Sequence, residues 1–117
     1  MSKTLILLNE APYGSERSYN GLRLAGSISR REGEVVKLFL MGDAVGCAKR
    51  GQKVPAGYYN VGDMVRTVAS RKGEVGVCGS CMDARGIAEG DLLDGASRST
   101  MDQLTDWTLW ADRTIVF

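Results

Sequence analysis

The sequence predicts an α/β domain, in which a mainly parallel sheet is covered by helices on both faces. Short apolar runs are separated by longer amphipathic stretches, which is the pattern of strands and helices in such folds. The runs at residues 4–9 and 35–41 are almost continuously apolar, as strands buried on both faces are. With 117 residues the chain has room for one hydrophobic core, so we expect a single domain over residues 1–117.

Capping and breaking residues divide the first half of the chain. The first strand leads into a loop at residues 9–14 that contains proline and glycine. Ser15 is a favourable N-cap for a helix that runs to about residue 30, and Gly33 is a favourable stop. After the second strand, Asp43 is expected to cap a short helix that ends near residue 48.

The second half begins with an irregular stretch. Residues 50–60 are rich in glycine and contain a proline, so we expect a long loop there. The apolar spacing of residues 61–70 predicts a helix, and residues 75–77 a brief strand. Ser99 is expected to cap the last helix, and residues 113–117 to form the closing strand.

The charge balance and the hydropathy exclude several partners. The 15 basic and 14 acidic side chains leave a formal net charge of +1, so we expect no nucleic-acid partner. Arg30 and Arg31, a small basic cluster, are interpreted as solvated surface. No apolar run approaches the roughly 20 residues that span a bilayer, and residues 5–8 are too short a run for a secretory signal. We therefore expect a cytoplasmic protein without a membrane partner.

The composition also limits the chemistry. The chain contains no histidine, which excludes Ser-His-Asp catalysis, Cys-His catalysis and zinc sites that use histidine. Its three cysteines are too few to surround a zinc ion, and an odd number does not suggest a disulfide framework. The glycines of residues 42–46 match neither phosphate-binding motif. We expect no metal and no cofactor, and we interpret Cys47 as a packing residue.

The strongest chemical signal is the pair Cys78 and Cys81, which directly follows the brief strand. In parallel sheets the working site lies at the carboxyl ends of the strands, which brings this pair near residues 9–14 and 42–47. The thiolate is the reactive form of cysteine, and free backbone N–H groups or the guanidinium of Arg85 can lower the thiol pKa. The second thiol can resolve a persulfide or a sulfenic acid by forming a disulfide.

Several motifs in the same order make the chain resemble the DsrE-like superfamily (DsrE/DsrF-like), and closely its YchN-like branch. The resemblance covers nearly the whole sequence. The motifs are NEAPYGSE (9–16), LRLA (22–25), KLFLMGDAV (37–45), RGQK (50–53), VCGSCMDARGI (77–87), LLDG (92–95) and WTLWADRTIVF (107–117).

The resemblance implies a three-layer domain with a mainly parallel five-stranded sheet, which assembles as a homotrimer or homohexamer. In the sulfur-relay members of the superfamily, a cysteine after a central strand holds sulfur as a persulfide and passes it to a partner protein. Cys78 matches that position. Cys81 has no counterpart in the single-cysteine relay members. A second cysteine at this position resembles the YchN-like branch.

Three functions are consistent with these observations. The first is a sulfur carrier, similar to a sulfurtransferase, with Cys78, Cys81 and Arg85 as its catalytic residues and with a sulfur donor and an acceptor as partners. The second is a thiol-disulfide redox module in which the same cysteine pair cycles. The third is a non-catalytic oligomeric binding protein. The substrate or partner pocket is expected near Asn9, Tyr13, Asp43 and Gly86.

Overall fold

The computed structural model describes residues 2–117 and contains a sheet of five strands. The strands are β1 (Lys3–Leu8), β2 (Val35–Leu40), β3 (Glu74–Cys78), β4 (Ala96–Ser99) and β5 (Arg113–Val116). The α-helices are α1 (Arg17–Ser29), α2 (Val61–Ser70), α3 (Gly79–Ala84) and α4 (Met101–Trp110), and the 3-10 helices are η1 (Gly42–Ala48) and η2 (Glu89–Asp91).

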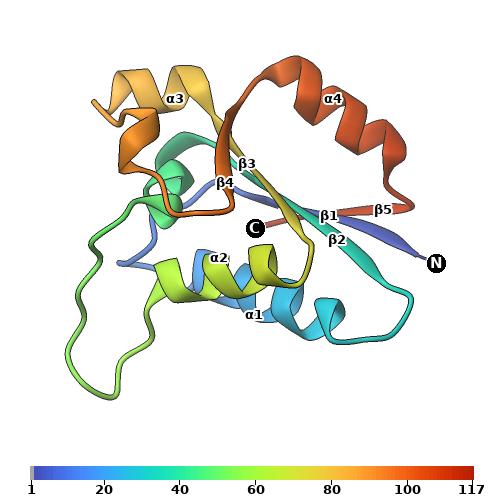
Figure 1. Ribbon diagram of the computed structural model, residues 1–117, viewed down its shortest axis with the longest axis horizontal. Coiled ribbons are helices and arrows are strands. Elements are labelled where there is room, and N and C mark those ends of the chain that lie inside the picture. Colours follow the sequence, from blue (N-terminus) through green and yellow to red (C-terminus); the bar gives the residue numbers. More distant parts are fainter. Residues whose placement is uncertain (1) are drawn as a thin grey trace.

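The sheet has the strand order β4-β3-β2-β1-β5, and every neighbouring pair is parallel. Helices α1 and α2 cover one face of the sheet, while α3 and α4 lie on the other side (Figure 1). This three-layer arrangement confirms the predicted fold class. The carboxyl ends of the strands share one edge of the sheet, the left-hand edge in Figure 1, where the polar loops and η1 gather.

Strands β1 and β2, which pair with each other inside the sheet, form the middle of the hydrophobic core. In β1, Leu5 and Ile6 point to opposite faces and both are fully buried, which explains why this strand is apolar without interruption. On the α4 face, Phe39 meets the ring of Trp107 edge-on, with the ring centroids 6.0 Å apart. Gly76 makes this packing possible, because a Cβ there would lie 3.0 Å from Phe39 and 3.1 Å from Trp107.

Most of the expected elements are confirmed, but three expected caps are wrong. Helix α1 begins at Arg17, after Glu16, so Ser15 is not its cap. Asp43 lies inside η1, which follows Met41, and the Asp43 carboxylate binds a guanidinium instead. Ser99 is the last residue of β4, and the next residue, Thr100, caps α4 by accepting the Gln103 N–H at 3.2 Å.

Three elements were not expected from local patterns, namely β4, α3 and the 3-10 helix η2. Strand β4 has the sequence Ala-Ser-Arg-Ser, which lacks an apolar run because it lies at the edge of the sheet and only β3 pairs with it. The turn expected after Cys78 is a short helix, α3. Among residues 2–117, no helix has both the length and the apolar character needed to cross a bilayer.

Candidate functional site

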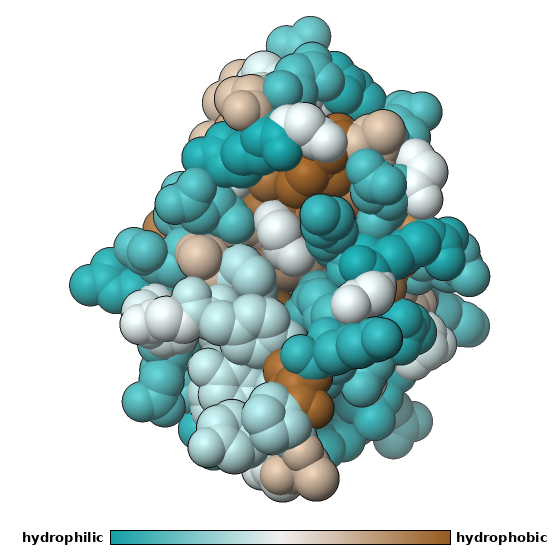
Figure 2. Space-filling model, turned by 90° about the vertical axis from the view of Figure 1, so that its left-hand side faces the viewer, coloured by the Kyte–Doolittle hydropathy of each residue, from teal (hydrophilic) through white to brown (hydrophobic). Residues whose placement is uncertain are grey.

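The carboxyl edge of the sheet brings the cysteine pair next to η1, as the position of the pair after a strand predicts. Cys78 is the last residue of β3 and the residue before α3, and only 8% of its surface is exposed. Cys81 lies in the first turn of α3 and is half-buried. Both are free thiols. Figure 2 views this edge of the molecule and shows a small hydrophobic area recessed among hydrophilic side chains.

Hydrogen bonds give the two thiols different pKa values. Burial raises the pKa of Cys78, but the side chains of Cys81 and Ser80 and the N–H groups of both residues hydrogen-bond to its sulfur, and the net pKa is lowered. The Sγ of Cys78 lies 3.4 Å from the Ser80 hydroxyl oxygen. Burial and the hydrogen bond to Cys78 raise the pKa of Cys81. Of the two thiols, Cys78 therefore becomes a thiolate at the lower pH.

The backbone of η1 also contacts the cysteine pair. The N–H of Gly42 donates to Cys81 Sγ at 3.2 Å, and this bond opposes the rise in the Cys81 pKa. Gly42 adopts a φ of +57° and lies against the carbonyl oxygen of Asn9, 3.3 Å from where a Cβ would be. A glycine at this position therefore lets the chain turn sharply after β2 and aim an N–H group at the sulfur.

Cys78 borders a cavity of about 270 Å³ on the α4 side of the sheet. Its lining includes the apolar side chains of Phe39 and Met101 and the polar side chains of Ser80, Arg98 and Thr100. The cavity offers an approach to the Cys78 sulfur, which is otherwise enclosed by the hydrophobic core.

Arg98 is a site residue that the sequence analysis missed. Its guanidinium binds the Asp83 carboxylate through two hydrogen bonds of 2.8 and 2.9 Å and lies over Gly79. It also interacts electrostatically with Cys78, so its charge favours the thiolate. Arg98 belongs to β4, the strand that had no local signal, and nothing in the sequence placed it beside the cysteine.

Arg85 takes a different position from Arg98. Its guanidinium donates two hydrogen bonds to Asp43 Oδ1, at 2.8 and 3.0 Å, and a third to the carbonyl oxygen of Cys81 at 3.0 Å. Its charge lowers the pKa of Cys81. Arg85 therefore joins η1 to α3 and acts on the second thiol of the pair.

The expected pocket residues lie around η1 but outside the cavity beside Cys78. The Asn9 amide donates to the carbonyl oxygen of Phe117 at 3.4 Å, beside β5. The Tyr13 hydroxyl donates to Gln52 at 2.7 Å, in the loop of residues 50–60. Gly86 follows α3 with a φ of +66°. None of these three residues, nor Asp43, lines the cavity beside Cys78.

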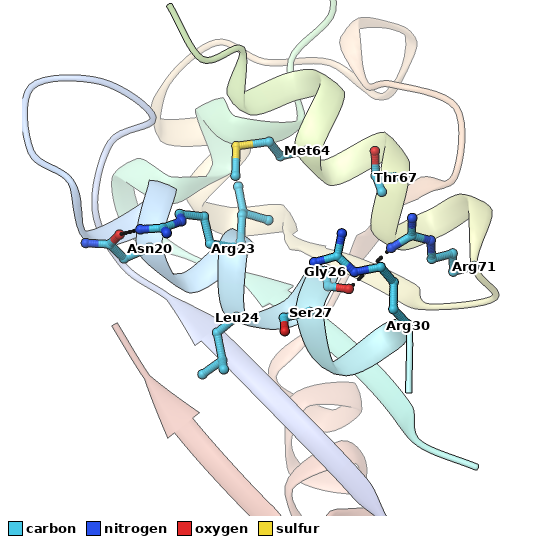
Figure 3. Close-up of a pocket in the computed structure, with 10 residues that line it drawn as sticks. Asn20, Arg23, Leu24, Gly26, Ser27, Arg30, Met64, Thr67 and Arg71 are labelled. Carbon is cyan, nitrogen blue, oxygen red and sulfur yellow. Dashed lines mark hydrogen bonds between the residues drawn. The ribbon is translucent and has the colours of Figure 1, made fainter. Parts of the chain in front are cut away.

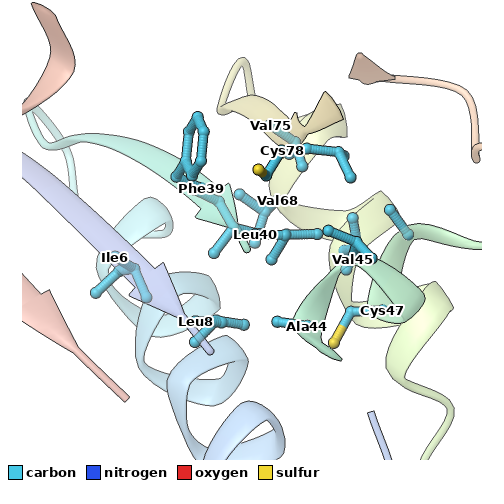
Figure 4. Close-up of a cluster of buried hydrophobic side chains, with 14 of the residues drawn as sticks. Ile6, Leu8, Phe39, Leu40, Ala44, Val45, Cys47, Val68, Val75 and Cys78 are labelled. Carbon is cyan, nitrogen blue, oxygen red and sulfur yellow. The ribbon is translucent and has the colours of Figure 1, made fainter. Parts of the chain in front are cut away.

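Cys47 lies apart from the cysteine pair. Its side chain is fully buried, and burial raises its pKa to about 12. Figure 4 shows its sulfur beyond Ala44 and Val45, on the far side of the cluster from Cys78. Among residues 2–117, no three His, Cys, Asp or Glu side chains gather in a way that could hold a metal ion.

The fold and the cysteine at the carboxyl edge define the class of protein. The sequence model of the DsrE/DsrF-like family matches residues 2–117, so the chain belongs to the DsrE/DsrF-like family, which is associated with sulfur relay. Within it, the chain is 42% identical to protein YchN of Escherichia coli K12 over 118 residues, with all of both chains covered. It is 38% identical to an uncharacterised protein of Methanopyrus kandleri, covering 96% of this chain and 91% of the relative.

Solved structures agree with this assignment. The crystal structure of Escherichia coli YchN superimposes with a TM-score of 0.94 over the whole of both chains, which confirms the resemblance to the YchN-like branch. A protein of unknown function from Methanobacterium thermoautotrophicum has a TM-score of 0.78 at 13% identity, again over both whole chains. That second likeness shows the fold alone.

Proposed function

We propose that the protein is a sulfur carrier, in which Cys78 takes up a sulfane sulfur as a persulfide and passes it to a partner thiol. The observation that carries the proposal is the state of Cys78, a thiol of lowered pKa that borders an open cavity. A thiolate is the nucleophile that sulfur uptake requires. The association of the family with sulfur relay supports the same chemistry.

The proposed transfer consists of two sulfur displacements. The Cys78 thiolate attacks the outer sulfur of a donor persulfide, R–S–SH. A new S–S bond forms on Cys78, the S–S bond of the donor breaks, and the donor leaves as the thiolate R–S⁻. An acceptor thiolate then attacks the outer sulfur of the Cys78 persulfide. The S–S bond on Cys78 breaks, and Cys78 leaves as a thiolate. The lowered pKa of Cys78 favours this second step, because a thiol of lower pKa is a better leaving group.

Cys81 is proposed to unload the carrier when no acceptor is present. Cys81 lies in the first turn of α3, three residues after Cys78, and its side chain lowers the pKa of Cys78, which supports attack on the inner sulfur of the persulfide. Attack of the Cys81 thiolate on Cys78 Sγ forms a Cys78–Cys81 disulfide and releases hydrosulfide, HS⁻. The N–H of Gly42 and the guanidinium of Arg85 favour the Cys81 thiolate that this step needs.

The test is intact-protein mass spectrometry of the reduced protein after incubation with glutathione persulfide. The Cys81→Ser variant, which cannot unload, is expected to gain the mass of one sulfur atom, and a Cys78→Ser variant is expected to gain none. The wild type and the matched control Cys47→Ser are expected to load in the same way and then to unload as the Cys78–Cys81 disulfide. Unchanged loading of the Cys78→Ser protein contradicts the proposal.

A thiol-disulfide module is the second candidate, and the hydrogen bond between the two thiols favours it. In that function the pair loses two protons and two electrons to an oxidant, and no sulfur is added. The same spectra separate the two functions, because disulfide formation lowers the mass by two hydrogen atoms. A wild-type protein that shows this loss beside a Cys81→Ser variant that gains no sulfur supports the module rather than the carrier.

Assembly as a homotrimer or homohexamer stays a prediction. Exposed apolar side chains support it. Leu109 is 80% exposed, Met101 59% and Val116 58%. Met101 also lines the cavity beside Cys78, so we propose that a neighbouring subunit narrows the approach to the sulfur. Light scattering of the wild type and of a Leu109→Asp variant tests this: an assembly that the substitution dissociates is expected, and a monomeric wild type contradicts it.

A further inference from the structure

A second hollow lies between helices α1 and α2, in the layer on the other side of the sheet from α4 (Figures 1 and 3). It has a volume of about 530 Å³, within the range of about 300–1,000 Å³ that is common for small-molecule sites. The groove takes side chains from both helices and from Arg71, the residue that follows α2. We refer to it as the α1–α2 groove.

Unpaired arginines are concentrated at this groove. Among residues 2–117, the arginines within 4.0 Å of a carboxylate are Arg17, Arg50, Arg66, Arg85, Arg98 and Arg113. The arginines without such a partner are Arg23, Arg30, Arg31 and Arg71. Three of these four, Arg23, Arg30 and Arg71, line the α1–α2 groove, and no acidic residue lines it. The groove is therefore positive in a protein whose net charge is only +1.

Two of these arginines lie at one end of the groove. Figure 3 shows the side chains of Arg30, from the end of α1, and Arg71 both reaching over Gly26. Arg71 Nη1 donates to the carbonyl oxygen of Gly26 at 3.3 Å, which uses one of its donors and fixes its direction. Like charges that approach without a carboxylate between them repel each other, and a bound anion relieves that repulsion. Planar guanidinium groups also match the oxygen atoms of a phosphate.

The other end of the groove is ordered too. Arg23 donates to the Asn20 side chain at 3.2 Å and lies over the Tyr19 ring, 5.4 Å from its centroid. Between the two ends, the lining contains the hydroxyls of Ser27 and Thr67 and the apolar side chain of Met64. The groove thus combines cationic donors with an apolar wall, the combination that a small organic anion requires.

We propose that the α1–α2 groove binds a small phosphorylated compound, with its phosphate groups between Arg30 and Arg71. The site is separate from the cysteine pair and does not depend on the sulfur-carrier function. A nucleic acid fits less well, because the unpaired arginines surround one hollow and do not form an extended stripe, and the net charge is near zero. The arginines come from separate helices, so no local phosphate-binding motif marks the site in the sequence.

Isothermal titration calorimetry on the full chain tests the proposal, with pyrophosphate and adenosine diphosphate as probes at one ionic strength. The wild type is expected to bind at least one of them. Arg30→Gln and Arg71→Gln are expected to weaken binding by about 10- to 100-fold, the loss that follows from removing charge-assisted hydrogen bonds. Arg31→Gln is the matched control, because it removes the same charge from an unpaired arginine outside the groove lining. That variant is expected to bind within about threefold of the wild type.

The two probes distinguish the sources of the phosphate. Tighter binding of adenosine diphosphate indicates an organic phosphate that uses the apolar wall, and equal binding indicates a site for inorganic pyrophosphate; both support the proposal. Absence of binding to both probes overturns it, as does an equal loss in the Arg31→Gln variant. Tighter binding of a hexaglutamate peptide or an RNA oligonucleotide than of either probe also overturns it. Circular dichroism melting of each variant shows whether it is folded, and Arg30→Gln removes no protein hydrogen bond that the structure shows.

Discussion

The cavity beside Cys78 and the α1–α2 groove are both lined by arginine, but they differ in how that positive charge is balanced. Beside the cysteine pair, Asp83 holds Arg98 through two hydrogen bonds, and Asp43 holds Arg85. In the groove, Arg30 and Arg71 have no carboxylate within 4.0 Å.

The difference separates two uses of the same side chain. A guanidinium that is already bound to a carboxylate is fixed in direction and nearly neutral as a pair, so it adjusts a neighbouring thiol without attracting anions strongly. An arginine without a carboxylate retains its full charge for a ligand. We therefore expect thiol chemistry at the first site and anion binding at the second, with little effect of one on the other.

The largest expected effect is the loss of sulfur loading in Cys78→Ser, combined with unchanged loading in Arg30→Gln. The serine variant lacks the nucleophile, while Arg30 lies on the other side of the sheet. Mass spectrometry after incubation with glutathione persulfide measures both, with Cys81 replaced by Ser in each protein so that the sulfur is retained. If Arg30→Gln loses loading while it stays folded, the two sites are coupled and the comparison fails.

The next largest effect is expected from the salt concentration, which changes anion binding in the α1–α2 groove more than it changes the reactivity of Cys78. The Debye length falls from about 10 Å at 0.1 M to about 3 Å at 1 M salt, so exposed charges are screened while short hydrogen bonds persist. Over this range we expect pyrophosphate affinity to fall more than about tenfold. The rate of Cys78 alkylation by iodoacetamide is expected to change less than about twofold. Calorimetry measures the affinity, and timed alkylation measures the rate. Equal sensitivity of both to salt contradicts the assignment of anion binding to the groove and thiol chemistry to Cys78.

The two thiols of the pair are expected to differ in their pH profiles. Because the pKa of Cys78 is lowered and that of Cys81 is raised, Cys78 becomes a thiolate first as the pH rises, and its alkylation midpoint lies below that of Cys81. Cys47, buried with a pKa of about 12, is expected to stay unmodified while the protein is folded.

A Cys81→Ala variant tests whether Cys81 lowers the pKa of Cys78. The substitution removes a hydrogen bond that stabilises the Cys78 thiolate, so the Cys78 midpoint moves to higher pH. At pH 7 its alkylation is expected to slow by about three- to tenfold. Peptide mapping after timed iodoacetamide treatment gives the rate for each cysteine. A Cys78 rate that stays constant in the variant shows that Cys81 does not control the thiolate.

The smallest expected effect concerns Gly79. A Cβ at this position would lie 2.8 Å from the Arg98 guanidinium carbon, so Gly79→Ala displaces the guanidinium rather than the backbone. With the charge moved from Cys78, alkylation at pH 7 is expected to slow by about two- to threefold. Gly90→Ala is the control, because a Cβ there meets no atom within 4 Å. Equal rates for both alanine variants indicate that Arg98 does not act on the thiol.

Local patterns were sufficient for much of the fold. The apolar run of β1 and the helix α2 were expected close to where they lie, because their signals are carried by neighbouring residues. The position of Cys78 at the end of a strand follows from the same local pattern, and the parallel sheet then places it at the carboxyl edge. The caps failed because several polar residues near each helix start compete for one position.

Contacts between distant residues decided the rest. Strand β4 forms only because β3 offers a free edge, and it brings Arg98 to Cys78 across a separation that no motif encodes. The α1–α2 groove likewise exists only where two helices pack together and place Arg30 beside Arg71. Backbone propensity and apolar periodicity are properties of a short segment, so they can be read along the chain. The balance of charge around a side chain depends on which segments meet, and packing alone determines that.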